Sequence, residues 1–320
     1  SIESFSSLQT GVIMAGYYLG YVAGSHFVPS LIRNVGHIRV FAALAAITTA
    51  SSLAFGLFVS PWAWLLIRVL NGACVVGMYM VVESWLNEQS NGPSRGRIFS
   101  TYMMSTLVAL GAGQMLLLTA DPSQLMLFAL GAVFITLGVV PIAVTKVSEP
   151  KLTIAEPIGL KKLLKISPLG TMGVLAAGVV TGSFWGMLPV FGAELAMGES
   201  QIASLMSLTI LGGAALQWPI GHISDLMDRR KALIGTTIAT AAVLIIISAN
   251  LNNSGWFMLP LIVLFGGLMF SLYGLCVAHT NDHIEMDQVL EATRGLLLIY
   301  GVGAMLGPLI SGAAMQFIGP

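Results

Sequence analysis

Residues 221–230 read GHISDLMDRR, a short turn of Gly, Asp and Arg residues between two apolar stretches. Gly221 permits a neighbouring helix to approach closely, and Asp225 can accept hydrogen bonds from a helix N-terminus or from an arginine. Arg229 and Arg230 can bridge to carboxylates or to lipid phosphates. Ordinary basic charge at a membrane surface would explain the arginines but not the spacing of Gly221 and Asp225. We therefore predict that this turn fastens helix ends together.

The turn joins the seventh and eighth of ten long apolar stretches. These cover residues 8–28, 38–58, 61–87, 97–119, 124–145, 169–192, 200–222, 231–250, 255–280 and 291–318. The chain is 56% hydrophobic and 9% charged, whereas a soluble chain carries about 25% charged residues. A hydrocarbon core of about 30 Å needs about 20 helical residues. One such stretch could be a buried helix of a soluble protein, but ten in series predict an all-α polytopic membrane protein.

Basic residues are sorted between the connections of these stretches. All of the Lys and Arg residues except Arg68 lie in the first, third, fifth, seventh and ninth connections or in the first four residues of the stretch that follows one of them. Because basic residues are retained on the cytoplasmic side of a polytopic protein, we predict that these loops are cytoplasmic. The lipid bilayer is the expected partner. The formal net charge is zero, which argues against a nucleic-acid partner.

A weak internal repeat relates the two halves of the chain at an offset of about 195 residues. Asn71-Gly72 in the third stretch matches Gly266-Gly267 in the ninth, and Ser94-Arg95-Gly96, which opens the fourth stretch, matches Thr293-Arg294-Gly295, which opens the tenth. Extending the repeat predicts two parallel six-helix pseudo-repeats, with the first and last helices missing and ten helices present. A native ten-helix protein is the alternative.

The repeat also predicts the domain boundaries. Residues 1–145 form the N-terminal half, helices 2–6 of the twelve-helix pattern, and residues 169–320 form the C-terminal half, helices 7–11. Residues 146–168 form a linker. Within it, residues 158–166 place three lysines opposite an apolar side, a pattern typical of a helix lying on a membrane surface. A simple tether between the halves is the alternative interpretation.

Arg68 is the exception to the sorting of charge. A charge inside a membrane helix costs about 2.5–3.5 kcal/mol on insertion scales, so Arg68 should face protein or a watery cavity. Helical spacing puts Asn71, Tyr79 and Glu83 on the same face. This face could be a cavity wall that recognises an anionic group or takes part in ion coupling. Alternatively, Arg68 braces the helix through neighbouring backbone.

Glu83 lies near the predicted cytoplasmic end of the same stretch. Arg95, Arg97 or Arg39 are better placed than Arg68 to pair with it, which favours a cytoplasmic ion-pair latch. The alternative is a carboxylate that carries a proton, because burial can raise the pKa of a glutamate toward neutrality.

Small and polar residues within other stretches complete the candidates. Gly303 and Gly307 share one helix face with the helix-bending Pro308, which predicts close helix packing between the two halves. Further large polar or amphipathic side chains could line a cavity or pack between helices: Gln114, Trp185, Gln217, Tyr273 and Tyr300.

The acidic and histidine residues of 279–287 match no recognised metal spacing and indicate a solvated loop. Neither a catalytic set nor a cofactor motif is present. We therefore expect no enzyme activity, no metal and no cofactor.

These residues resemble the major facilitator superfamily. Residues 221–230 are similar to its signature G-x-x-x-D-R-x-G-R-R, although Leu226 and Asp228 replace an Arg and a Gly. Arg68-x-x-x-Gly72 resembles the fourth-helix motif of the family, which implies that helix one is missing.

The equivalent first-half loop keeps Gly36 and Arg39 but has Arg33 where the family has Asp, so the latch of that half is in doubt. Residues 81–84, 95–97 and 217–221 resemble the bacterial YcaD-like branch.

The resemblance implies a secondary transporter that moves a small molecule across the bacterial inner membrane by alternating access. Protons are a candidate coupling ion, and a monomer is expected. A non-transporting membrane sensor or assembly protein that retains the fold is the alternative. The predicted substrate cavity contains Arg68, Asn71, Gln114, Trp185, Gln217 and Tyr300. The predicted cytoplasmic latch contains Gly36, Arg39, Glu83, Arg95, Arg97, Gly221, Asp225, Arg229 and Arg230.

Overall fold

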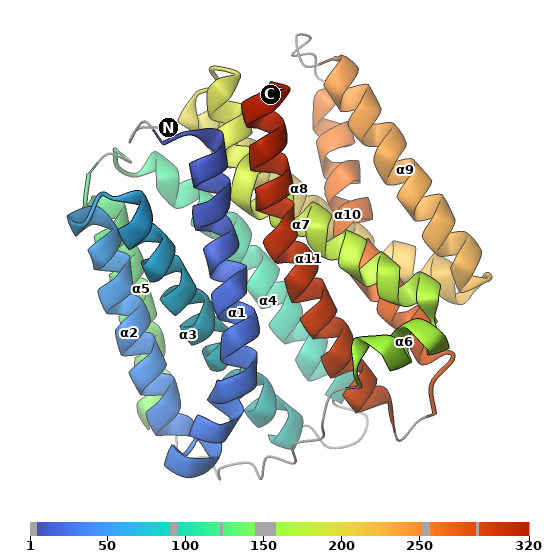
Figure 1. The fold of residues 1–320 in the computed structure, drawn as a ribbon, viewed down its shortest axis with the longest axis horizontal. Helices are drawn as coiled ribbons and strands as arrows, with labels where there is room; N and C mark the ends of the chain where they lie inside the picture. Colours follow the sequence, from blue (N-terminus) through green and yellow to red (C-terminus); the bar gives the residue numbers. More distant parts are fainter. Residues whose placement is uncertain are drawn as a thin grey trace. The chain divides into compact units, whose positions relative to one another are not determined.

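The computed structural model describes residues 5–89, 95–121, 124–144, 158–250, 257–285 and 288–319, and in these ranges the chain is helical without strands (Figure 1). Each of the ten apolar stretches forms one long helix. The helices are α1 (Ser7–Val35), α2 (His37–Leu57), α3 (Pro61–Gln89), α4 (Arg95–Met115), followed by the short 3-10 helix η2 (Leu116–Leu118), α5 (Met126–Val144), α6 (Leu160–Ile166), α7 (Pro168–Glu194), α8 (Glu199–Asp225), α9 (Arg229–Ala249), α10 (Met258–Asn281) and α11 (Val289–Phe317).

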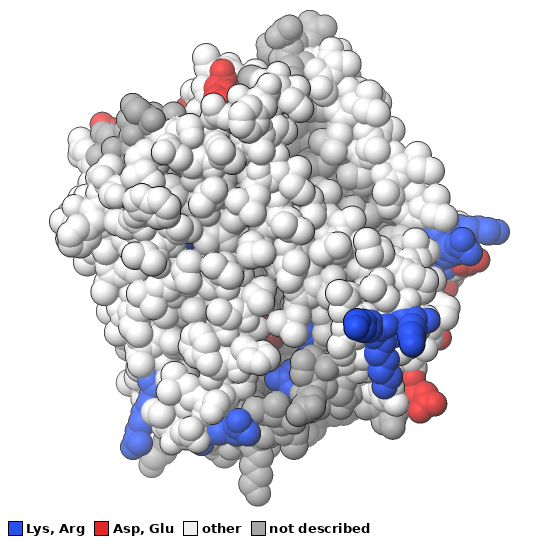
Figure 2. Space-filling view, viewed as in Figure 1, with Lys and Arg blue, Asp and Glu red and all other residues white. Residues whose placement is uncertain are grey.

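Length and composition make the described helices suitable for a bilayer. Eight of them are long and apolar enough to cross a membrane, as expected for a hydrocarbon core of about 30 Å. On the face drawn in Figure 2, charged side chains are sparse and most of the visible surface is uncharged. The prediction of an all-α polytopic membrane protein is confirmed, with the short α6 as an additional helix.

Local sequence signals determine where several helices begin and end. Ser6 and Gln9 form a capping box at the start of α1: the Gln9 backbone N–H donates to Ser6 Oγ (3.2 Å), and the Ser6 N–H donates to Gln9 Oε1 (3.0 Å). Gly36 separates α1 from α2 with a φ of +94°, a conformation that favours glycine. Asp228 caps α9 by accepting from the Arg230 N–H (2.8 Å).

The helices group into two compact units. Unit 1 contains Ser1–Met103, Thr119–Ile154 and Pro308–Pro320, and unit 2 contains Met104–Leu118 and Ala155–Gly307. Two of the four boundaries between the units fall inside helices, one in α4 and one in α11, and the other two follow η2 and lie between α5 and α6.

Glycines lock α1 against α3 within unit 1. A Cβ atom added at Gly20 would collide with the backbone of Val69, and one added at Gly72 would collide with the carbonyl oxygen of Tyr17. The two backbones therefore touch directly, which is the close approach that small residues permit between membrane helices.

Unit 2 repeats this lock between α8 and α10. Gly212 meets the backbone of Val263, and Gly266 meets that of Thr209. These contacts lie 192 residues after Gly20 and 194 residues after Gly72. The internal repeat predicted from the sequence is thus present in the packing, down to the carbonyl that each glycine contacts.

The linker contains α6, whose two sides differ as the sequence pattern predicted. Leu163 is completely buried in an apolar cluster of unit 2 that includes Val174 and Leu296. The three lysines of α6 are exposed on the other side. α6 is therefore anchored to unit 2 through Leu163.

Candidate functional site

The Arg68 guanidinium lies inside unit 1 against aromatic rings. Its Cζ atom is 5.2 Å from the ring centroid of Phe55 on α2, within the range of a cation–π interaction. Tyr17 and Tyr18 of α1 lie within electrostatic range of the guanidinium. Its Nε atom is buried and has no hydrogen-bond partner among the residues that the structure describes. A positive charge with a buried, unsatisfied donor is thus held between α1, α2 and α3.

Asn71 also contacts α2, because its Nδ2 donates a hydrogen bond to Ser51 Oγ of that helix (3.0 Å). Ser51 is buried, so this hydrogen bond joins the two helices inside the unit. In this structure Asn71 braces α3 against α2, which is the packing role available to any polar residue within a membrane helix.

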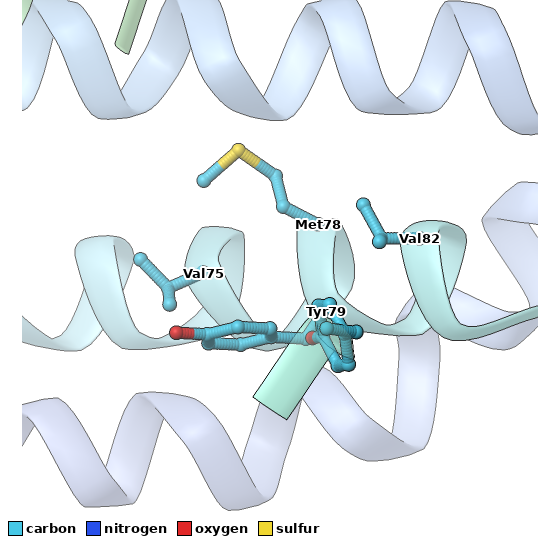
Figure 3. Close-up of a pocket in the computed structure, with 5 residues that line it drawn as sticks. Val75, Met78, Tyr79 and Val82 are labelled. Atoms are coloured by element: carbon cyan, nitrogen blue, oxygen red, sulfur yellow. The ribbon is translucent and has the colours of Figure 1, made fainter. Parts of the chain in front are cut away.

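Further along α3, Tyr79 lines a pocket of about 210 Å³ with Val75, Met78 and Val82, and Tyr102 of α4 lines it as well (Figure 3). Tyr102 also donates a long hydrogen bond of 3.5 Å to Glu83 Oε1. The polar face predicted along α3 therefore divides into Arg68 and Asn71 next to α2, and Tyr79 and Glu83 around this pocket.

Trp185 packs in an aromatic cluster of unit 2. Its ring lies edge-on to Phe184 at 5.0 Å and to Phe270 of α10 at 6.3 Å. Such pairs favour tight packing of α7 against α10.

Tyr300 of α11 contacts Tyr273 of α10, with 4.9 Å between the ring centroids. Gln114 is half-buried on α4, and Gln217 is exposed on α8.

Arg229 joins three helix ends in unit 2. Its Nη2 atom lies 2.9 Å from Asp225 Oδ1 at the end of α8, and its Nε atom lies 2.7 Å from Asp282 Oδ2 just after α10. The predicted role of Asp225 and Arg229 in fastening helix ends agrees with this geometry. Asp282 had been assigned to a solvated loop, and no local pattern marked it as the third member. Arg230 contributes its backbone N–H to the Asp228 cap.

Gly221 does not have the packing role that the sequence suggested. A Cβ atom added there would meet nothing within 4 Å, and α8 simply continues through it to Asp225. The expectation of a close helix contact at Gly221 was wrong, because no neighbouring helix of the described chain reaches this position.

In the first half, Gly36 ends α1 and Arg39 is exposed. Between the described side chains, no ion pair includes Arg33, Arg39 or Glu83. The side chains of Arg95 and Arg97 lie outside the described part of the structure, so their predicted pairing with Glu83 stays a prediction.

Gly303 and Gly307 of α11 pack closely, but against α7 of their own half. Cβ atoms at these positions would collide with the carbonyl oxygens of Leu175 and Val179. Gly303 and Gly307 thus pack within the C-terminal half, because the face they share is turned to α7. The predicted contact between the two halves of the sequence occurs further along α11, where the carbonyl oxygen of Pro308 lies against Gly11 of α1 and Gly312 lies beside the same glycine.

Among the described residues, no group of three His, Cys, Asp or Glu side chains is arranged to hold a metal ion. Long apolar helices in two repeated arrangements, with a charged turn at the helix ends, define a polytopic α-helical membrane protein of the transporter class.

Comparison with known proteins agrees with this class. Residues 3–171 and 170–320 each match the model of the Major Facilitator Superfamily. The chain belongs to this superfamily and is a secondary transporter, not an enzyme.

Relatives described as uncharacterized MFS-type transporter YcaD match almost the whole of this chain. Those of Escherichia coli and Shigella flexneri are 28% identical over 317 residues, which is 98% of this chain and 81% of theirs.

Solved structures show the same fold. A bacterial homologue of the human lysosomal transporter Spinster, inward-facing and occupied, has a TM-score of 0.76 at 17% identity, covering 98% of this chain and 75% of that one. The nucleoside transporter NupG has a TM-score of 0.69 at 12% identity, covering 98% and 84%.

Proposed function

We propose that this transporter carries a small molecule across the bacterial inner membrane by alternating access, with its basic loops on the cytoplasmic side and Arg68 as an essential residue. The observation that carries the role of Arg68 is its buried Nε donor without a partner. An unsatisfied buried donor costs about 1–3 kcal/mol, and ionisable residues inside a membrane are functional by default. We infer that an acceptor reaches this atom during transport.

The acceptor is an oxygen atom, either of the transported molecule or of a protein group that moves during the cycle. Candidate cavity residues in unit 2 are Gln114, Trp185, Gln217 and Tyr300, and protons are the candidate coupling ion. For Asn71 we propose the brace to Ser51 seen in the structure.

Arg229 supports the second part of the proposal, a latch at the cytoplasmic ends of the helices. Its two ion pairs connect α8, the start of α9 and the end of α10, and charged pairs of this kind can open without unfolding a helix. Glu83, Arg39, Arg95 and Arg97 are proposed as the corresponding groups of the first half.

Uptake into proteoliposomes tests the role of Arg68. The wild-type chain is assayed with a panel of radiolabelled sugars, amino acids, nucleosides, carboxylates and quaternary amines, alongside Arg68→Ala, Arg68→Lys and the exposed control Arg33→Ala. We expect uptake of at least one compound, lost in Arg68→Ala and reduced in Arg68→Lys, because lysine lacks the planar donor fork. Normal uptake by a well-folded Arg68→Ala would exclude Arg68 from the mechanism. If only carboxylate compounds require Arg68 for uptake, the acceptor belongs to the transported molecule. If the other compounds require Arg68 as well, the acceptor belongs to the protein.

Topology is tested by cysteine labelling. Cys74 and Cys276 are both buried and can be replaced by Ser. In right-side-out spheroplasts, an impermeant maleimide should label a Glu199→Cys variant but not Arg39→Cys. Labelling of Arg39→Cys alone would reverse the proposed orientation.

A further inference from the structure

The pocket of unit 1 has an apolar and aromatic wall. Val75, Met78, Tyr79 and Val82 come from successive turns of α3, and Tyr102 comes from the first turns of α4 (Figure 3). Its volume of about 210 Å³ suits a molecule of about one aromatic ring. Aromatic faces attract cations, and a methionine thioether makes favourable contacts with aromatic rings.

A carboxylate lies at the rim of this pocket. Glu83 follows the lining residue Val82 directly, and its Oε1 atom accepts from the hydroxyl of the lining residue Tyr102. The Glu83 side chain is exposed, and it forms no ion pair with any side chain that the structure describes. Its negative charge therefore lies beside the pocket, next to the hydroxyl of Tyr102.

We propose that this pocket is a binding site for a small organic cation with an apolar or aromatic body. The body would replace water against Val75, Met78 and Val82, while the positive charge would lie near Glu83 and over the rings of Tyr79 and Tyr102. A carboxylate and a ring face each attract a cation, and both interactions strengthen where water is excluded. An anion of the same shape is repelled by Glu83. This site goes beyond the proposed function, since binding here does not require Arg68. The cation would take the place that the proposed latch gives to Arg95 or Arg97 beside Glu83, so binding of the cation and closure of the latch exclude each other.

The probe is benzyltrimethylammonium, which carries one ring and one fixed positive charge. Isothermal titration calorimetry of the purified full chain in lipid nanodiscs measures its binding, with benzylsulfonate as an anion of similar size. We expect saturable binding of the cation and at least about tenfold weaker binding of the anion. If the wild-type chain bound the two probes equally, or did not bind the cation, the proposal would be overturned.

Two variants then locate the cation. Glu83→Gln keeps the size of the side chain and removes its charge, and Tyr79→Leu removes one ring. We expect the dissociation constant of the cation to rise about tenfold in Glu83→Gln and severalfold in Tyr79→Leu. Glu199→Gln, an exposed site at the start of α8, is the matched control and should bind as the wild type does. Unchanged binding in a monodisperse Glu83→Gln would refute the assignment.

Discussion

Arg229 Nε and Asp282 Oδ2 lie 2.7 Å apart although 53 residues of chain separate them. The pair links the turn between α8 and α9 to the end of α10, while the Asp225 pair stays within the turn. Asp282 is therefore the member of this cluster that adds a helix distant in sequence, α10, to the α8–α9 turn.

Replacing Asp282 by Asn should weaken this connection with only a modest loss of stability. The two side chains are 29% and 47% exposed, and exposed ion pairs contribute about 0.2–1 kcal/mol. We expect a small fall in Tm in low salt that nearly vanishes in 1 M salt, where screening is strong. Arg230→Gln is the control, since Arg230 is exposed. A loss independent of salt would contradict an ionic origin.

Gly20→Ala and Gly266→Ala should each destabilise the protein by about 1–3 kcal/mol, the usual cost of overpacking. In both cases the new methyl group meets a backbone carbonyl of the neighbouring helix, which cannot move aside as a flexible side chain could. Unfolding by denaturing detergent measures the change. Gly131→Ala on α5 is the control, because its Cβ would meet nothing within 4 Å. Equal stability of the three variants would refute the proposed lock.

Asn71 and Ser51 should show energetic coupling in a double-mutant cycle. Their hydrogen bond of 3.0 Å lies within the helical bundle, where such bonds average about 0.6 kcal/mol and reach about 1.7. The cycle uses Asn71→Ala, Ser51→Ala and the double variant, compared by their free energies of unfolding. Strictly additive effects would show that the bond adds no stability.

Leu163→Ala should cost about 2–5 kcal/mol, the range for removing a buried leucine, because Leu163 is fully buried in the core of unit 2. Leu160→Ala, on the same short helix but 52% exposed, should have little effect. Thermal denaturation in detergent compares the two. If Leu160→Ala lowered the stability more than Leu163→Ala, α6 would not be anchored as described.

The fold could be predicted because it depends on patterns that the chain repeats. Helix positions followed from apolar length, and the repeat was visible at Gly72 and Gly266, where a side chain would collide with a neighbouring backbone. Contacts between residues that are far apart in the sequence left no such pattern. Asp282 follows α10 among other polar residues, and only the folded chain brings it to Arg229.

The same limit applies to the candidate site. Helical spacing predicted one polar face that includes Arg68 and Tyr79, but it could not reveal that the Phe55 ring lies beside the guanidinium or that Tyr102 lines a pocket with Tyr79. At Gly221, composition suggested a close contact that the neighbouring helices do not make.

The glycine locks also limit how a transport cycle can proceed. Helices α1 and α3 cannot slide or rotate against each other without driving a carbonyl oxygen into a neighbouring α-carbon, and the same holds for α8 and α10. We therefore expect each pair to move as one body during a transport cycle, so that spin labels on its two members report an unchanged distance.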